Sequence, residues 1–297
     1  MKIAVIGAGK WGSALFSALS KNNDCVITSR THRDIPGFVS IDKAIDRELL
    51  VFALSSQHTR EFLSKHFINK NQKILVASKG IEASTGLFLN QIFEKFINKN
   101  NLAYLSGPSF ASEVLVSLPC ALVISSVNLN LCDEMAKLFP SSYMKIYSSD
   151  DIIGAEVCGA YKNVLAIASG VCDGLKLGNN ARASLIARGL IEMSRFGKFF
   201  GANDETFMGL SGAGDLFLTA SSVLSRNYRV GLGLSQNVDI KSILNEINEV
   251  AEGVETAQAI QKIAQKYNIY TPIVNEVVSM IEGKSATNSL CDLLRKK

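Results

Sequence analysis

Lys162 is a charged side chain in an otherwise apolar segment. It lies in GAEVCGAYKNVLAIASG, residues 154–170, which carries no other charge after Glu156. Lysine is seldom buried without a partner, and burial disfavours the charged ammonium and lowers the pKa of a lysine toward neutrality. A lysine in that state exchanges protons with an oxygen atom of a bound molecule. The alternative is a surface lysine whose stem packs on the protein while its ammonium reaches water.

Other residue types that carry proton chemistry are scarce. The three histidines, His32, His58 and His66, all lie in the first half of the chain. The histidine–aspartate chemistry of 2-hydroxy-acid dehydrogenases is therefore not expected. No His/Cys spacing is typical of a zinc site, so we expect no metal, and no G-x-S-x-G motif is present. An acid or base must then be Lys, Asp or Tyr, which makes Lys162 the leading candidate.

Two more segments hold polar side chains that could act with Lys162. Lys79, in ASKGIE, follows an expected strand and adds a second cation, unless it is an ordinary loop lysine. In SGAGDLFLTASSVLSRNYRVG, residues 211–231, Asp215 follows a glycine-rich bend, and an adjacent Ser-Arg-Asn run supplies hydrogen-bond donors. Arginine beside small polar side chains suits a phosphate group. The alternative is the ordinary polar end of a helix.

A glycine-rich loop opens the chain. GAGKWG places Gly7, Gly9 and Gly12 directly after a buried apolar segment at residues 2–7. In a dinucleotide site the first glycine allows the tight turn, the second lets a pyrophosphate approach the backbone, and the third lets helix and strand pack closely. The N-terminus of the following helix then faces the phosphates. The loop predicts a dinucleotide site, with a purely structural turn as the alternative.

The second strand bears on which dinucleotide binds. Its end reads Thr28-Ser29-Arg30, with Arg33 nearby, and no carboxylate stands there to bind a ribose 2′-hydroxyl. Arg30 or Arg33 can accept a 2′-phosphate instead. The cofactor is therefore expected to be NADP or NAD, with NADP favoured or tolerated. The alternative is that the two arginines belong to a solvated loop.

Elements that position these residues can be read from hydrophobic patterns. In the first half, short β-branched segments alternate with helical segments at 57–67, 85–97 and 130–139. Strands that alternate with helices indicate a parallel sheet covered on both faces. The expected strands are 2–7, 25–30, 49–56, 73–78, 102–107, 119–126 and 143–149.

The pattern changes near residue 150, and no convincing strand follows. The 297 residues suit two domains, which we place at 1–150 and 151–297. The expected fold is α/β: an N-terminal Rossmann-type parallel-sheet domain that binds the dinucleotide, then an all-α C-terminal domain for the substrate. The expected helices of the second domain are 152–172, 181–197, 205–210, 214–234, 240–248, 253–267 and 273–282.

Composition narrows the classes of partner. The net charge is +4 without a dense Lys/Arg run, so nucleic acid is not an expected partner. No run of about 18 apolar residues predicts a membrane span. The six cysteines contain no C-x-x-C pair, and the first apolar segment is too short for a signal peptide. These features indicate a reduced, cytoplasmic protein.

Together these segments resemble the bacterial NAD(P)-dependent glycerol-3-phosphate dehydrogenases. The resemblance spans nearly the whole chain, and it is specific because several motifs occur in the expected order and spacing. The motifs are GAGKWG at 7–12, SKGIE at 78–82, GPSFA at 107–111, GAYKN at 159–163, SGAGDLFLT at 211–219, SRN at 225–227 and VAEGVET at 250–256.

The resemblance implies an enzyme and assigns roles to residues. The implied reaction is the reversible reduction of dihydroxyacetone phosphate to sn-glycerol 3-phosphate with NADPH or NADH, which feeds phospholipid synthesis. Lys162 is then the proton donor and acceptor, Asp215 orients it, and Lys79 contacts the substrate. The implied substrate-binding residues are Lys79, Gly107, Ser109, Lys162, Asp215, Thr219, Ser225, Arg226 and Asn227.

The cofactor-binding residues follow from the same comparison. Lys10 departs from the Ser or Asn more usual in the glycine loop, and an extra cation beside the pyrophosphate favours binding. The implied set is Gly7, Gly9, Lys10, Trp11, Gly12, Arg30, Arg33, Lys79, Ala111, Arg226, Val250 and Glu252.

Two other functions remain to be weighed. A β-hydroxyacid dehydrogenase-like reductase would share the two-domain plan but act on a carboxylate substrate. A nucleotide-sensing regulatory protein would bind the dinucleotide without turnover, although the occurrence of Lys79, Lys162 and Asp215 in the expected order argues against it. A homodimer is the expected assembly.

Overall fold

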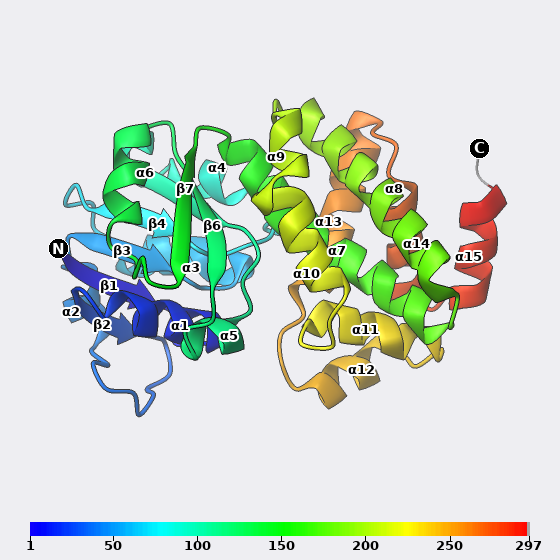
Figure 1. The fold of residues 1–297 in the computed structure, drawn as a ribbon, viewed down its shortest axis with the longest axis horizontal. Coiled ribbons are helices and arrows are strands. Elements are labelled where there is room, and N and C mark those ends of the chain that lie inside the picture. Colours follow the sequence, from blue (N-terminus) through cyan, green and yellow to red (C-terminus); the bar gives the residue numbers. More distant parts are fainter. Residues whose placement is uncertain (296–297) are drawn as a thin grey trace. The chain divides into compact units, whose positions relative to one another are not determined.

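The computed structural model describes residues 1–295, which fall into two compact units. The first is an α/β unit made of Met1–Lys79 and Leu87–Glu156, and the second is a helical unit made of Gly80–Gly86 and the chain from Val157 onwards (Figure 1). The segment 80–86 joins the helical unit, which the sequence patterns do not reveal. The domain division at residue 150 stays a prediction.

Within residues 1–295, seven strands form a single sheet in the order β2-β1-β3-β4-β5-β6-β7. All seven expected strands are present, although several end earlier than expected. Their bounds are β1 (Lys2–Ile6), β2 (Asp24–Thr28), β3 (Leu49–Phe52), β4 (Lys73–Val76), β5 (Leu102–Ser106), β6 (Cys120–Ser125) and β7 (Met144–Ser149).

The sheet departs from the all-parallel expectation at one pair. β6 runs antiparallel to β5, with Tyr104 opposite Ser125, whereas β6 and β7 are parallel to each other. The connection from β5 to β6 contains only the five-residue helix α5 (Ala111–Leu115). Residues 107–119 connect the two strands, which is close to the minimum of about a dozen residues that a parallel crossover needs, and β6 returns in the opposite direction.

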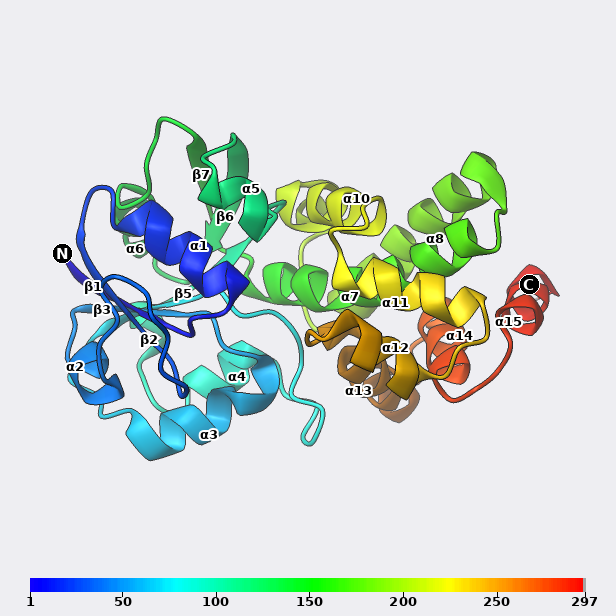
Figure 2. The same cartoon turned by 90° about the horizontal axis from the view of Figure 1, so that it is seen from below.

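Helices cover both faces of the sheet, as predicted. Alternate residues of β1 point to opposite faces: Ile3 and Val5 belong to one apolar cluster, and Ala4 and Ile6 belong to another. Figure 2 shows α1 and α6 on one side of the strands and α3 and α4 on the other. The helices of this unit are α1 (Lys10–Leu19), α2 (Ile41–Ile45), α3 (Ser56–His66), α4 (Leu89–Phe93), α5 and α6 (Leu129–Ala136).

The helix expected over 85–97 is wrong in its extent, because α4 covers only Leu89–Phe93. The residues before it form a turn in which the backbone N–H groups of Thr85 and Gly86 donate to the carbonyl oxygen of Glu82. Gly86 has a φ of +72°, a left-handed conformation that no helix continues.

The helical unit follows the expected pattern with two differences. The expected helix 214–234 is two helices, because Ser225 accepts a hydrogen bond from the backbone N of Tyr228 at 3.3 Å and so begins a new helix. A helix at the C-terminal end was also not expected. The bounds are α7 (Ile152–Gly174), α8 (Gly178–Phe199), α9 (Asp204–Met208), α10 (Asp215–Ala220), α11 (Arg226–Ser235), α12 (Ile240–Ile247), α13 (Glu252–Tyr267), α14 (Pro272–Ile281) and α15 (Ala286–Arg295).

α7 runs through the middle of the helical unit and touches α11 backbone to backbone (Figures 1 and 2). A methyl group on Gly170 would lie 2.1 Å from the carbonyl oxygen of Tyr228, and one on Gly231 would lie 2.0 Å from that of Ile167. Neither distance is possible for a real side chain, so glycine is required at both positions. This contact fixes the helix that carries Lys162 against the helix that begins with Arg226.

α7 also has the length and composition of a membrane span. Within residues 1–295 it alone is long and apolar enough to pass that test. However, 94% of that window is buried inside the protein, as is typical of the core helix of a globular fold. Glu156 and Lys162 interrupt the apolar run in the sequence, which is why the pattern alone does not single the helix out.

Glu156 joins the first turns of α7 to the start of α4. Its Oε1 accepts a hydrogen bond from the backbone N of Asn90 at 3.0 Å, while its Oε2 is buried and has no hydrogen-bond partner within residues 1–295. Burial disfavours the carboxylate and raises the pKa of Glu156 from 4.5 to about 8, and the charge of Glu94 adds to the effect. Backbone hydrogen bonds to the carboxylate act in the opposite direction.

The raised pKa predicts that Glu156→Gln stabilises the protein at high pH. Because the folded state binds the proton more tightly, raising the pH from 4.5 to about 8 lowers the free energy of unfolding of the native chain. Each pH unit between the folded and unfolded pKa corresponds to about 1.4 kcal/mol. Glutamine keeps the acceptor for Asn90 without the charge, so its advantage should grow across this window.

Urea unfolding at pH 5.5 and at pH 8 measures the effect. Glu61→Gln, at an exposed position of α3, makes the same change of charge and is the control. An advantage of Glu156→Gln that stays constant between the two pH values would contradict the assignment.

Candidate active site

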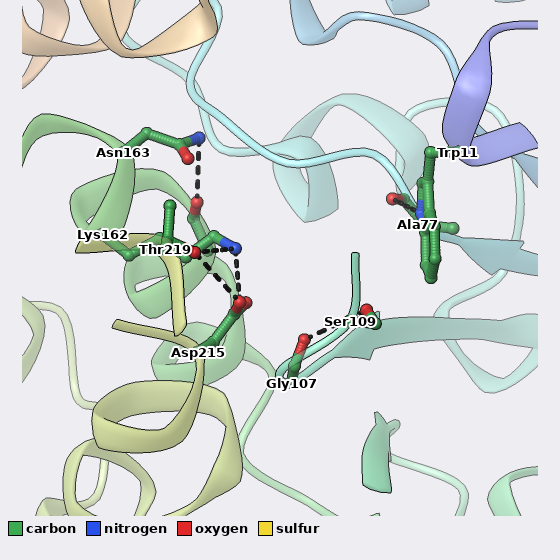
Figure 3. Close-up of polar contacts among 9 residues, drawn as sticks. Trp11, Ala77, Gly107, Ser109, Lys162, Asn163, Asp215 and Thr219 are labelled. Atoms are coloured by element: carbon green, nitrogen blue, oxygen red, sulfur yellow. Dashed lines mark hydrogen bonds and ion pairs between the residues drawn. The ribbon is translucent and has the colours of Figure 1, made fainter. Parts of the chain in front are cut away.

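Lys162 lies in a buried polar cluster inside the helical unit. Its Nζ donates to Oδ1 of Asp215 at 2.5 Å and to Oγ1 of Thr219 at 3.2 Å, and the three side chains point toward one another in Figure 3. Lys162 is 7% exposed and Asp215 is 1% exposed. Lys162 is therefore a buried, paired cation and not a surface lysine.

Local sequence explains how Asp215 and Thr219 meet this lysine. Asp215 is the first residue of α10, and Thr219 follows four residues later on the same face of the helix. A π-helical turn, η2 (Leu210–Gly214), leads into α10. A methyl group on Gly212 would lie 2.2 Å from the carbonyl oxygen of Phe207, so the glycine-rich SGAG sequence is needed for this close turn.

The charge of Asp215 affects the protonation of Lys162, which the sequence alone does not reveal. Burial of Lys162 disfavours its ammonium, but the carboxylate of Asp215 favours it, since opposite charges in contact stabilise each other. The hydroxyl of Thr219 lies 3.4 Å from the same carboxylate oxygen. The arrangement is suited to keeping a proton on Lys162 and holding that proton in a fixed direction.

Three of the sequence motifs meet at the start of α13. The backbone N of Gly253 donates to Oδ1 of Asn227 at 3.0 Å. A methyl group on Gly253 would lie 2.7 Å from that oxygen and 2.8 Å from the carbonyl oxygen of Asn163. The GAYKN, SRN and VAEGVET segments are thus packed together within the helical unit, and Asn227 directs its amide oxygen into this contact.

The beginning of α11 gathers the other residues expected to bind phosphate. Ser225 is the N-cap, and Arg226 is the first helical residue. The Nη1 atom of Arg226 lies 3.8 Å from Oε2 of Glu249, which precedes the exposed Val250. Glu252 is the first residue of α13.

The glycine loop of the α/β unit has the shape that a pyrophosphate requires. Gly7 has a φ of +115°, and a methyl group on Gly12 would lie 1.8 Å from the carbonyl oxygen of Gly7. By contrast, among the described residues no atom lies within 4 Å of a methyl group placed on Gly9, and none of their side chains caps α1 by a hydrogen bond. The loop therefore presents open space at the N-terminus of a ten-residue helix, which fits a dinucleotide.

Trp11 and Lys79 lie near this loop within the same unit. Nε1 of Trp11 donates to the carbonyl oxygen of Ala77 at 3.1 Å, just after β4 (Figure 3). Lys79 follows two residues later and is partly buried, whereas Lys10 is exposed.

The remaining candidates of the α/β unit follow strand ends. Gly107, directly after β5, has a φ of +111° and its carbonyl oxygen lies 3.4 Å from Oγ of Ser109 (Figure 3). Ala111 begins α5, and Arg30 and Arg33 are exposed on the loop after β2. Because β1, β2, β4 and β5 are parallel, these residues and the glycine loop share the carboxyl edge of the sheet, where ligands bind in such folds.

Comparisons with known proteins identify the family of this chain. Family models for the N-terminus and the C-terminus of NAD-dependent glycerol-3-phosphate dehydrogenase match residues 30–132 and 151–292. The chain is 63% identical over 296 residues to a glycerol-3-phosphate dehydrogenase [NAD(P)+] of Campylobacter jejuni, covering 100% of this chain and 99% of that one. The chain belongs to the glycerol-3-phosphate dehydrogenase family.

More distant members of the glycerol-3-phosphate dehydrogenase family share the same fold. A relative from a Nitratiruptor species is 56% identical over 296 residues, covering 100% of this chain and 99% of the relative. The crystal structure of the glycerol-3-phosphate dehydrogenase of Coxiella burnetii superposes with a TM-score of 0.91 at 30% identity, covering 99% of each chain. The sheet and the helical unit described above are thus the fold of this family.

Sequence reasoning missed four residues that the structure places beside these groups: Asn163, Arg229, Glu249 and Gly253. Arg229 follows Arg226 by three residues, and this helical spacing could have revealed it. No pattern identifies Glu249, and Gly253 lies within the VAEGVET motif without a role assigned to it, since the contacts of both depend on how α13 packs against α7 and α11.

We predict that Asp215→Asn destabilises the protein. The change removes the carboxylate that contacts the buried ammonium of Lys162, and removing one partner of a buried ion pair lowers the free energy of unfolding by about 3–5 kcal/mol. The double variant Lys162→Met/Asp215→Asn should lose less than the single variant, because no unpaired charge is then buried. Chemical denaturation of both variants measures the difference.

An exposed ion pair provides the control. Asp204 accepts from Lys198 at 2.7 Å, but both side chains are more than half exposed. Asp204→Asn should therefore change the free energy of unfolding little. A double variant as unstable as Asp215→Asn would show that the pair is not the source of the loss.

Proposed function

We propose that this chain catalyses the reversible, NAD(P)-dependent interconversion of dihydroxyacetone phosphate and sn-glycerol 3-phosphate. The observation that carries the proposal is the buried ion pair of Lys162 and Asp215, in a chain of the glycerol-3-phosphate dehydrogenase family. The product serves phospholipid synthesis, and the cytoplasm is the proposed location. We propose that residues 1–150 bind the dinucleotide and residues 151–297 bind the substrate.

Proton transfer is assigned to Lys162. When bound, the nicotinamide cofactor supplies a hydride to the ketone carbon. Lys162 donates a proton from Nζ to the ketone oxygen and takes it back in the reverse direction. Asp215 and Thr219 hold Nζ in place, at 2.5 Å and 3.2 Å, so the proton lies on a fixed path. Lys79 contributes a second positive charge toward the developing alkoxide.

The phosphate of the substrate is assigned to the start of α11. Arg226 provides a guanidinium, Ser225 a hydroxyl, and Asn227 the amide nitrogen that its contact with Gly253 leaves available. Because the phosphate is held in place, the reacting carbon of the substrate is positioned, and part of the binding energy serves to orient the substrate. Gly107 and Ser109 contact the substrate as well, by resemblance to the family.

The dinucleotide is assigned to the carboxyl edge of the sheet. The glycine loop and the N-terminus of α1 would hold its pyrophosphate, and the exposed Arg30 and Arg33 would bind the 2′-phosphate of NADP. Further contacts are proposed for Lys10, Trp11, Lys79, Ala111, Arg226, Val250 and Glu252.

A coupled absorbance assay tests this function. Purified protein with dihydroxyacetone phosphate should oxidise both NADPH and NADH, and separate titrations give the preference. Small β-keto acids are the comparison, because a reductase of the β-hydroxyacid class would use them instead. Absence of oxidation with dihydroxyacetone phosphate would overturn the proposal.

Two substitutions should separate proton transfer from phosphate binding. Lys162→Ala should lower kcat by roughly 10² or more while the Kd of NADPH barely changes, because a positioned acid is lost. Arg226→Ala should mainly raise KM for dihydroxyacetone phosphate. Steady-state kinetics measure both, with circular dichroism to verify folding. Near-native turnover of the Lys162 variant would remove Lys162 from the acid role.

We also propose a homodimer. Its support is that three large side chains of the helical unit, Ile191, Phe199 and Tyr270, are each half exposed or more. Sedimentation velocity on the assayed sample distinguishes a dimer from a monomer.

A further inference from the structure

An acidic residue, Glu249, lies beside the start of α11, to which we assign the phosphate, and the proposed mechanism does not explain its role. Arg226 and Arg229 lie three residues apart and share one face of the helix. Glu249 lies between them: its Oε2 is 3.8 Å from Nη1 of Arg226, and its Oε1 is 3.6 Å from Nη2 of Arg229. One carboxylate thus serves two guanidinium groups.

Neither contact is a hydrogen bond. Both distances exceed the 2.7–3.2 Å that N–H···O bonds take. In addition, Nε of Arg229 is buried and has no hydrogen-bond partner among the described residues. A buried donor without an acceptor is unfavourable, and guanidinium groups bind oxyanions best through paired, shorter contacts. Glu249 therefore neutralises the charge of the two arginines but accepts no hydrogen bond from either of them.

Glu249 lies outside the helices of the unit and is partly exposed. It lies between α12, which ends at Ile247, and α13, which begins at Glu252. Asn248, immediately before it, has a left-handed backbone with a φ of +49°. The side chain of Glu249 is 26% exposed, so solvent already reaches the carboxylate.

We propose that Glu249 is an internal counter-ion that the phosphate of the substrate replaces, and that Arg229 is a further phosphate-binding residue. The inference rests on the proposed function. A phosphate monoester carries close to two negative charges and three acceptor oxygens, so it binds two arginines better than a carboxylate does. A substrate with a single carboxylate offers no more than Glu249 already provides. Glu249 thereby favours phosphorylated substrates over carboxylate substrates.

Binding of inorganic phosphate to the full-length protein tests the exchange directly. Glu249→Gln removes the competing charge, so the Kd of phosphate, measured by isothermal titration calorimetry, should fall about twofold to fivefold, the scale of a partly exposed ion pair. Glu246→Gln is the matched control, because Glu246 is exposed on α12 and forms no ion pair within residues 1–295. It should leave the Kd unchanged. An unchanged or higher Kd for Glu249→Gln would overturn the proposal.

A second variant tests Arg229. Arg229→Gln should weaken phosphate binding about tenfold, because a charged pair of donors is lost. It should also raise KM for dihydroxyacetone phosphate without lowering kcat, whereas a merely structural defect would lower both kcat and the melting temperature. Phosphate binding as tight as that of the native chain would remove Arg229 from the site.

The outcomes separate this inference from the proposed function. Turnover of dihydroxyacetone phosphate together with an unchanged phosphate Kd in Glu249→Gln would reject the exchange and leave the function standing. Tighter phosphate binding in that variant without turnover by the native chain would reject the function and support the exchange.

Discussion

A lysine and an aspartate that are both removed from water depend on each other, and much of the helical unit is arranged around that dependence. Lys162 and Asp215 come from α7 and α10, and their contact requires the tight π-helical turn before α10. Such a pair adds little net stability compared with apolar residues, but it is highly unfavourable to break. The contact with Asp215 thus allows the fold to keep a charged proton donor buried, away from the solvent-exposed positions where lysine usually occurs.

Sequence patterns predicted the parts of the structure that depend on local chemistry. The strand positions, the glycine loop and the burial of Lys162 follow from hydrophobic periodicity and from the conformational needs of glycine. The break between α10 and α11 was missed, although Ser225 is a recognisable N-cap. An apolar pattern continues across that break, so periodicity alone favoured a single helix.

Features that depend on distant packing could not be predicted in this way. The antiparallel β6, the segment 80–86 within the helical unit and the position of Glu249 between two arginines are all set by contacts between residues far apart in sequence. A single carboxylate in a loop carries no sequence signal of its partners. The roles proposed for Gly107, Ser109, Ala111, Val250 and Glu252 came only from the resemblance to a family.

The contact between Gly170 and Gly231 has a consequence for what the protein can recognise. Since the two backbones already touch, α7 and α11 cannot move closer, and any side chain at either glycine would force them apart. The spacing between the lysine on one helix and the arginines on the other is therefore built into the main chain. The distance between the proposed proton donor and the proposed phosphate-binding residues is therefore fixed. We expect it to favour molecules in which the reactive oxygen and the charged end are separated by a matching length.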